Sequence, residues 1–190
     1  MNCLKNLQIL NFEKNEFNRL RFEWRNLKKE FNQISTIHRK ASSLFYKEVM
    51  DVVKEFDLDD PFSQEESTEK KGKAKVFELD EIKKIYRSVA VKTHPDKNSS
   101  SDEAFKELVN SKKEGKVNKL LDSAKESNIK IEEISFEVVK RIETEVTELK
   151  KEIEDIELSI EWKWYHGNNN TQKQIIKTIT DRLKHDKKKN

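Results

Sequence analysis

Residues 81–108 read EIKKIYRSVAVKTHPDKNSSSDEAFKEL, and this stretch contains one of the two prolines of the 190-residue chain. Ahead of the proline, apolar side chains recur at the three- and four-residue spacing of one helix face, at Ile82, Ile85, Tyr86 and Val89. Pro95 cannot continue a helix, because its ring clashes with the preceding turn and it lacks an N–H. The stretch therefore predicts two helices joined by a short loop at His94-Pro95-Asp96.

The ends of these two helices carry their own signals. Asp80 stands where its carboxylate can cap a helix that begins at Glu81. Ser100 and Glu103 have the spacing of a capping box for the second helix. Further along, Gly115 marks a bend or a break. The sequence thus predicts short helices on both sides of the loop.

The composition of the chain favours helices throughout. Charged residues make up 39% of the chain and hydrophobic residues 34%, with only three glycines and two prolines. So few chain breakers leave little room for the turns that sandwiches, barrels and alternating strand–helix folds require. We therefore expect an all-α fold with long helices and a small compact core.

Two long apolar patterns flank the central stretch. The first extends from Phe17 to Phe56 and predicts one helix over about residues 11–57. The second extends from Val139 to Ile160 and keeps the same heptad spacing. The two helices are expected to pair as an antiparallel coiled-coil hairpin with the small helical unit inserted between them. An intermolecular coiled coil would satisfy the same pattern, and the sequence does not decide between the two.

The predicted organisation has five segments. A long N-terminal coiled-coil helix occupies residues 1–57, and a flexible linker follows at 58–75. The small helical unit spans 76–130, and the C-terminal coiled-coil helix spans 131–166. Residues 167–190 are expected to form a short amphipathic helix and a disordered basic tail that ends in RLKHDKKKN.

Several classes of function fit the chain poorly. Cys3 is the only cysteine, so neither an internal disulfide nor a cysteine-based zinc site is expected. A net charge of +3 is too balanced for a dedicated nucleic-acid coat. No nucleophile–base set or glycine-rich phosphate loop is present, which predicts neither an enzyme nor a cofactor. Without a signal peptide or a long apolar run, no membrane contact is expected and the expected location is the cytoplasm, of the host if the source is viral.

With its flanks, the proline loop resembles the J domain of DnaJ-family co-chaperones. That family has a basic helix, a His-Pro-Asp-Lys loop and a following antiparallel helix. Here these are EIKKIYRSVAVKT, HPDKN and SDEAFKEL, and the close resemblance covers residues 80–110. The chain looks like a minimal J-domain protein with coiled-coil flanks, similar to a group of viral and bacterial J-domain proteins.

The resemblance implies binding to a DnaK-type chaperone, the seventy-kilodalton heat-shock class, and stimulation of its ATPase. It assigns the trigger of ATP hydrolysis to the loop residues His94, Pro95 and Asp96. It assigns chaperone binding to the basic residues around the loop, which are Lys83, Lys84, Arg87, Lys92 and Lys97. The first three stand at positions i, i+1 and i+4 of the helix, so they share its solvent-facing side. Such a positive stripe steers and orients an acidic partner.

The chain also departs from the family pattern. The first helix of the family is not recognisable, and five positions carry residues other than the usual ones of the family: Ser88, Val89, Thr93, Ser111 and Lys112. KAKVFEL at 73–79 is the expected remnant of that helix. The alternative interpretation is therefore a structural or adaptor coiled-coil protein with a vestigial J domain. In either interpretation the coiled-coil helices supply dimerisation or a target contact, and nucleic-acid binding is a weaker third hypothesis.

Overall fold

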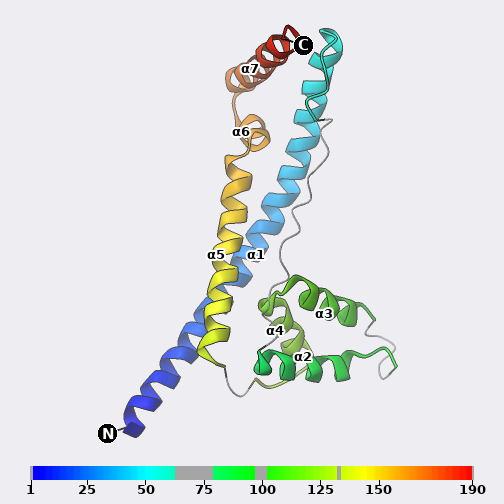
Figure 1. Cartoon of the computed structure of the whole chain (residues 1–190). Coiled ribbons are helices and arrows are strands. Elements are labelled where there is room, and N and C mark those ends of the chain that lie inside the picture. The colour runs from blue at the N-terminus through cyan, green and yellow to red at the C-terminus, as the bar shows by residue number, and fades with distance from the viewer. Residues whose placement is uncertain (1, 63–78, 97–101, 132–133, 190) are drawn as a thin grey trace. The chain divides into compact units, whose positions relative to one another are not determined.

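The computed structural model describes residues 2–62, 79–96, 102–131 and 134–189, with side chains of the first helix from Lys14 onward. Within these ranges every regular element is a helix and none is a strand, which confirms the all-α prediction. The elements in chain order are α1 (Asn2–Glu55), α2 (Asp80–Thr93), α3 (Asp102–Glu114), α4 (Val117–Glu126), α5 (Phe136–Leu158), α6 (Ile160–His166) and α7 (Asn169–Lys187) (Figure 1).

The chain divides into two compact units, and both long helices contribute to each. Unit 1 contains residues 1–27 and 70–149, and unit 2 contains residues 28–69 and 150–190. The pairing of the two long helices along their whole length stays a prediction, as does the division into five segments.

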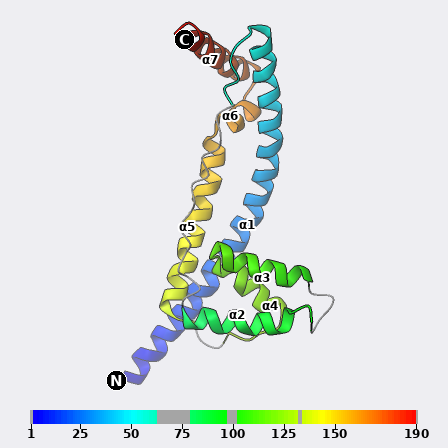
Figure 2. The same ribbon diagram turned by 45° about the vertical axis from the view of Figure 1, so that its right-hand side comes forward.

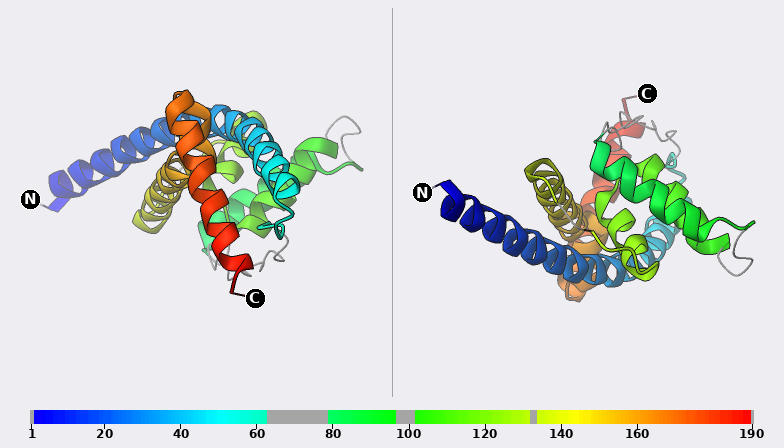
Figure 3. Two further views of the ribbon diagram at one scale, coloured as in Figure 1. Left: turned by 90° about the horizontal axis from the view of Figure 1, so that it is seen from above. Right: turned by 90° about the horizontal axis from the view of Figure 1, so that it is seen from below.

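Unit 1 is built around the helix pair that the proline loop joins. α2 and α3 run side by side in opposite directions, and α4 packs against both (Figures 1 and 3). The apolar face predicted for α2 is confirmed at Ile82 and Val89, which are fully buried. Other apolar side chains of unit 1 are also buried, at Leu108, Val117, Leu120, Leu121, Val138, Ile142, Leu20 and Trp24. Burial of a large apolar side chain stabilises a fold by roughly 1.5–3 kcal/mol, so parts of α1 and α5 belong to the stability of this unit.

Gly115 ends α3 rather than bending it. Its φ of 66° lies in the left-handed region, where glycine is unstrained. The Lys116 N–H bonds the Ser111 carbonyl at 3.0 Å, and the Gly115 N–H bonds the Lys112 carbonyl at 3.3 Å. This is the Schellman motif, which satisfies the last carbonyls of a helix. The predicted break is thereby confirmed, and it separates α3 from α4.

Two polar residues that depart from the family pattern lie in the core of unit 1. Thr93 is 6% exposed and Ser111 is fully buried, so neither position is on the surface. The Thr93 hydroxyl donates to the Val89 carbonyl at 2.9 Å, and the Ser111 hydroxyl donates to the Leu108 carbonyl at 2.7 Å. Buried hydroxyl groups destabilise a core unless they are hydrogen-bonded. These bonds to their own helices explain how the core accepts both residues.

Unit 2 has a separate small core. Phe45, Val49 and Val53 of α1 are buried there, and their partners include Trp164 of α6 and Ile176 of α7. The ring of Phe45 meets that of Trp164 edge to face, with 5.6 Å between centroids. Trp164 therefore contributes to the packing of this core.

The helix predicted over 131–166 is interrupted. α5 ends at Leu158, and Ser159 takes an extended backbone conformation as the N-cap of α6 (Figure 2). Its hydroxyl accepts a hydrogen bond from the Trp162 N–H at 3.3 Å and lies 3.2 Å from His38 Nε2. A serine side chain that caps a new helix in this way ends the preceding one. His38 is half-buried at this contact.

The basic tail is helical, which corrects the expectation of disorder. α7 begins after Asn168, whose side chain caps it by accepting from the Thr171 N–H, and continues to Lys187. Near its end, Lys184 lies 3.3 Å from the ring centre of Phe56, and Lys187 bonds to Asp57. These cation–π and ionic contacts within unit 2 fix the last turns of the helix. None of the described helices combines the length and the apolarity that a bilayer crossing requires.

Candidate functional site

The first turn of α2 differs from its predicted form. Leu79 occupies the N-cap position and makes no side-chain cap, so the prediction that Asp80 caps the helix is wrong. Asp80 is instead the first helical residue, and its carboxylate accepts a bond from Lys83 at 3.2 Å. Asp80 and Glu81 together still place negative charge at the positive end of the helix, which stabilises it. Ser100, the predicted cap of α3, and residues 73–78 of the expected helix remnant lie outside the described residues.

Only part of the basic stripe predicted on α2 is exposed to solvent. Lys84 and Arg87 are exposed, whereas Lys83 is half-buried and pairs with Asp80. Val91 follows on the same helix face as Lys84 and is 57% exposed. The structure thus brings two exposed cations and one exposed apolar side chain together on the solvent side of α2.

Lys92 points in a different direction from that expected of a docking residue. Its ammonium donates to the carbonyl of Ser127 at 2.9 Å and to that of Asn128 at 3.5 Å. These carbonyls belong to the end of α4, where unpaired carbonyls and the helix dipole favour a cation. Lys92 therefore links α2 to α4 within unit 1.

Replacing Lys92 with alanine is expected to destabilise the protein. The two carbonyl groups lose a charged donor, which corresponds to about 1 kcal/mol in the free energy of unfolding. The matched control is Lys84→Ala, because it removes an exposed lysine from the same helix and should change stability by less than about 0.5 kcal/mol. Urea unfolding followed by circular dichroism measures the stability of both variants. Equal free energies of unfolding would contradict a role of Lys92 in capping α4.

The loop after α2 presents its three predicted residues at the surface. Pro95 and Asp96 are exposed, and the side chain of His94 is 45% exposed. Nδ1 of His94 accepts a bond from the Asp96 N–H at 3.3 Å and lies 3.5 Å from the Asp96 carboxylate. The imidazole also packs edge to face on Phe105 of α3, with centroids 5.3 Å apart. The loop is therefore held to α3 through His94, while Asp96 projects into solvent. Lys97 lies outside the described residues.

The site is thus an antiparallel helix pair with exposed cations on its first helix and an exposed His-Pro-Asp loop between the two helices. Residues 73–113 match the family model of the DnaJ domain. The match includes α2, the loop and nearly all of α3, so this part of the chain is identified as a DnaJ domain. Searches of curated proteins and of solved structures found no significant match. J-domain proteins are in general co-chaperones and not enzymes.

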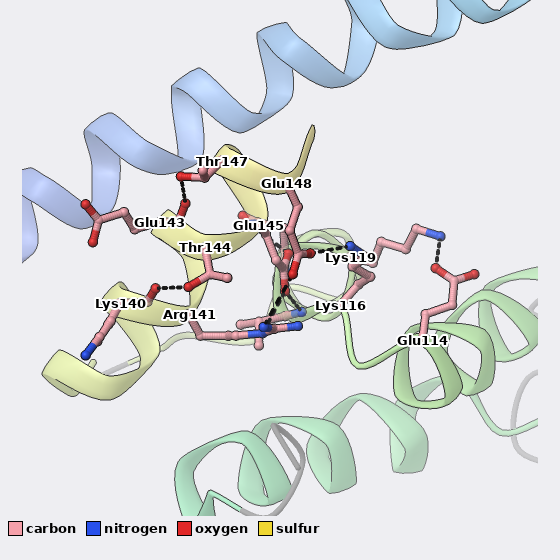
Figure 4. A network of polar contacts seen from close by, with 12 residues as sticks. Glu114, Lys116, Lys119, Lys140, Arg141, Glu143, Thr144, Glu145, Thr147 and Glu148 are labelled. Carbon is pink, nitrogen blue, oxygen red and sulfur yellow. Dashed lines mark hydrogen bonds and ion pairs between the residues drawn. The ribbon is translucent and has the colours of Figure 1, made fainter. Parts of the chain in front are cut away.

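The helix that follows the matched region depends on a distant residue. Lys116 occupies the N-cap position of α4 and supplies no side-chain cap. The cap comes instead from Glu145 of α5, which is 1% exposed. Its carboxylate accepts bonds from the Val117 N–H at 2.5 Å, the Asn118 N–H at 3.1 Å and the Asn118 side chain at 2.9 Å. Figure 4 shows Glu145 extending from α5 towards Lys116 at the start of α4. One buried carboxylate thus satisfies the first N–H groups of α4.

The same asparagine also binds a cation from α1. Arg21, 5% exposed, donates to the backbone carbonyl of Asn118 at 2.9 Å and to its side-chain oxygen at 2.6 Å. The Nη2 group of Arg21 donates to the Asp122 carboxylate at 2.5 Å, and Arg25 donates to the same carboxylate at 2.9 Å. Buried charges are tolerated when they are paired and hydrogen-bonded in this way. The network joins α1, α4 and α5 within unit 1.

Sequence reasoning missed this network. The heptad pattern predicts Glu145 to be one of the charged residues that flank the coiled-coil seam, because charged residues usually occupy such positions. One feature of the sequence indicated a distant cap: the two residues immediately before Val117 are Gly115 and Lys116, and neither has a capping side chain. A short helix without a local cap must obtain its cap from elsewhere in the fold.

Burial of Glu145 gives stability a specific pH dependence. Desolvation raises the pKa of Glu145 above 4.5, against the lowering effect of its bonds from Asn118 and Val117. The folded state therefore holds the proton more tightly than the unfolded chain. The part of the stability that depends on this shift is full below about pH 4.5 and is lost as pH rises through the raised pKa, while the hydrogen bonds that Glu145 accepts from α4 remain.

The comparison of wild type with Glu145→Gln isolates this effect from all other titrating groups. We expect the stability advantage of wild type over the variant to decrease as pH rises from about 4.5 towards neutrality. Urea unfolding of both proteins at closely spaced pH values provides the measurement. A difference that stays constant or grows with pH would contradict the assigned direction of the pKa.

Proposed function

We propose that this chain is a co-chaperone that binds a DnaK-type chaperone through α2 and stimulates its ATPase through the loop at residues 94–96. The observation that carries this proposal is the exposed His-Pro-Asp loop at the end of a helix with exposed cations. Lys84 and Arg87 provide the positive surface, and His94 holds the loop on α3. Lys83 and Lys92 are assigned a smaller part in binding, because both make contacts within unit 1.

In this proposal the protein performs no bond chemistry of its own. Its cations orient a negatively charged surface of the chaperone, which raises the association rate and fixes the register of the complex. The loop binds the ATP-hydrolysing conformation of the chaperone more tightly than its other conformations. This difference in affinity shifts the chaperone towards the hydrolysing state. The loop is suited to this because Asp96 is exposed while the neighbouring imidazole is fixed.

A second candidate function has support from α1. Ile37 and Leu44, which stand seven residues apart on this helix, are 38% and 43% exposed. Exposed apolar residues at heptad spacing are typical of coiled-coil contacts. They favour a role in self-association or target binding, which is the role that the adaptor alternative, with a vestigial J domain, assigns to the coiled-coil helices.

Charge reversal on α2 tests the binding step. The double variant Lys84→Glu with Arg87→Glu is expected to weaken binding to an ATP-bound DnaK-type chaperone by about tenfold or more. The matched control reverses two exposed lysines of α1, Lys40→Glu with Lys47→Glu, and should bind as wild type does. Surface plasmon resonance at two salt concentrations provides the readout, because a charge-steered complex weakens with salt. Equal affinities for the two variants would contradict the assigned surface.

A further inference from the structure

Unit 1 contains a groove that the proposed chaperone contact does not use. It has a volume of about 530 Å³ and lies between α1 on one side and the C-terminal part of α4 with residues 128–131 on the other. Its apolar lining comes from both sides, at Phe17, Phe22, Leu121, Ile129 and Ile131. Phe22 is 67% exposed, which is unusual for a phenylalanine within an ordered helix. An apolar wall of this kind marks an interaction surface.

The rest of the lining is strongly basic. Arg21, Arg25, Lys125 and Lys130 contribute to it, and no carboxylate does so among the described residues. Asp122 bonds both arginines and compensates only part of this charge. Glu132 and Glu133, which follow in the sequence, lie outside the described residues. The groove therefore combines apolar walls with an excess of positive charge.

The hydrogen bonds of the lining residues fix the shape of the groove. Arg21 is anchored to Asn118 of α4, so the α1 side cannot move independently of the α4 side. Asn128 has a φ of 52°, and the Ile129 N–H bonds the Ala124 carbonyl at 2.9 Å. This helix-terminating motif directs residues 129–131 along the groove. A preformed groove binds with less loss of conformational entropy than a flexible surface.

We propose that this groove binds an acidic peptide segment of a partner protein, with large apolar side chains of the segment on Phe22, Ile129 and Ile131. Carboxylates of the segment would meet Arg25, Lys125 and Lys130. The complementarity of charge argues for an acidic occupant. Three of the five apolar wall residues are aliphatic and cannot stack on bases, so a peptide fits better than a single-stranded nucleic acid. This surface is separate from residues 94–96, and its test does not depend on the co-chaperone function.

The test uses the full chain and a short fluorescein-labelled peptide that alternates glutamate with leucine and phenylalanine. Two further peptides replace either the acidic residues by lysine or the apolar residues by serine. The variant is Phe22→Ser with Lys125→Glu, both at exposed positions, so the fold is retained. The matched control is Phe136→Ser with Lys140→Glu, which makes the same two changes at exposed positions of α5 that do not line the groove.

We expect fluorescence anisotropy to show binding of the acidic apolar peptide alone, weakened about tenfold or more by the groove variant and unchanged in the control. Binding of a single-stranded oligonucleotide in preference to the peptide would overturn the proposal. So would self-association of the wild-type chain that the groove variant abolishes, because the occupant would then be a second copy. Equal peptide affinities for the groove variant and the control would overturn it as well.

Discussion

Glu145→Ala is expected to lower the free energy of unfolding by about 3 kcal/mol. The variant leaves the Val117 N–H, the Asn118 N–H and the Asn118 side chain without their acceptor in a buried site. It also removes the negative charge at the start of α4, where the helix dipole favours one. Urea unfolding followed by circular dichroism measures this free energy. The decrease should be among the largest for replacement of any single carboxylate in this protein.

Glu143→Ala is the matched control for this prediction. Glu143 lies on the same helix and is exposed, so both variants gain the same helix propensity from alanine. The control should change stability by less than about 0.5 kcal/mol. A Glu145→Ala variant as stable as the control would show that α4 does not depend on α5 for its cap.

His94→Gln is expected to abolish stimulation of the chaperone ATPase while binding through α2 persists. The imidazole packs on Phe105 and accepts a hydrogen bond from the Asp96 N–H. Glutamine has no ring, so the contact that holds the loop on α3 is lost. Because the side chain is 45% exposed, helix content and stability should change little. Affinity for the chaperone, measured by surface plasmon resonance, should stay within about threefold of wild type, since the cations of α2 are unchanged.

Asp96→Asn distinguishes loop geometry from charge. It keeps the backbone N–H that bonds His94 and removes only the exposed carboxylate. Loss of stimulation in both variants with binding retained would support a trigger made by the loop as a whole. Loss of helicity in His94→Gln would instead assign His94 to folding.

The features predictable from the sequence were those with local signals. Pro95 ends a helix by its own geometry, and the apolar spacing before it determines which face of α2 is buried. Gly115 likewise ended α3 through a conformation that favours glycine. These signals act within one or two turns, so they can be interpreted without knowledge of the fold.

The features that were missed depend on distant parts of the chain. Glu145 caps a helix 28 residues before it, and Arg21 bonds an asparagine 97 residues away. No periodicity in the sequence distinguishes such residues from ordinary solvent-facing charges. Ser159 was missed for a related reason, because serine is tolerated inside helices and its capping role shows only once α6 is seen to begin there.

Single-turnover ATP hydrolysis by a DnaK-type chaperone tests the central claim most directly. The preformed chaperone–ATP complex is mixed with excess wild-type protein, or with His94→Gln, and product formation is followed over time. The account predicts a rate constant at least about tenfold above that of the chaperone alone with wild type, and no increase with the variant. An unchanged rate with wild type across several DnaK-type chaperones would contradict the co-chaperone function and favour the coiled-coil adaptor.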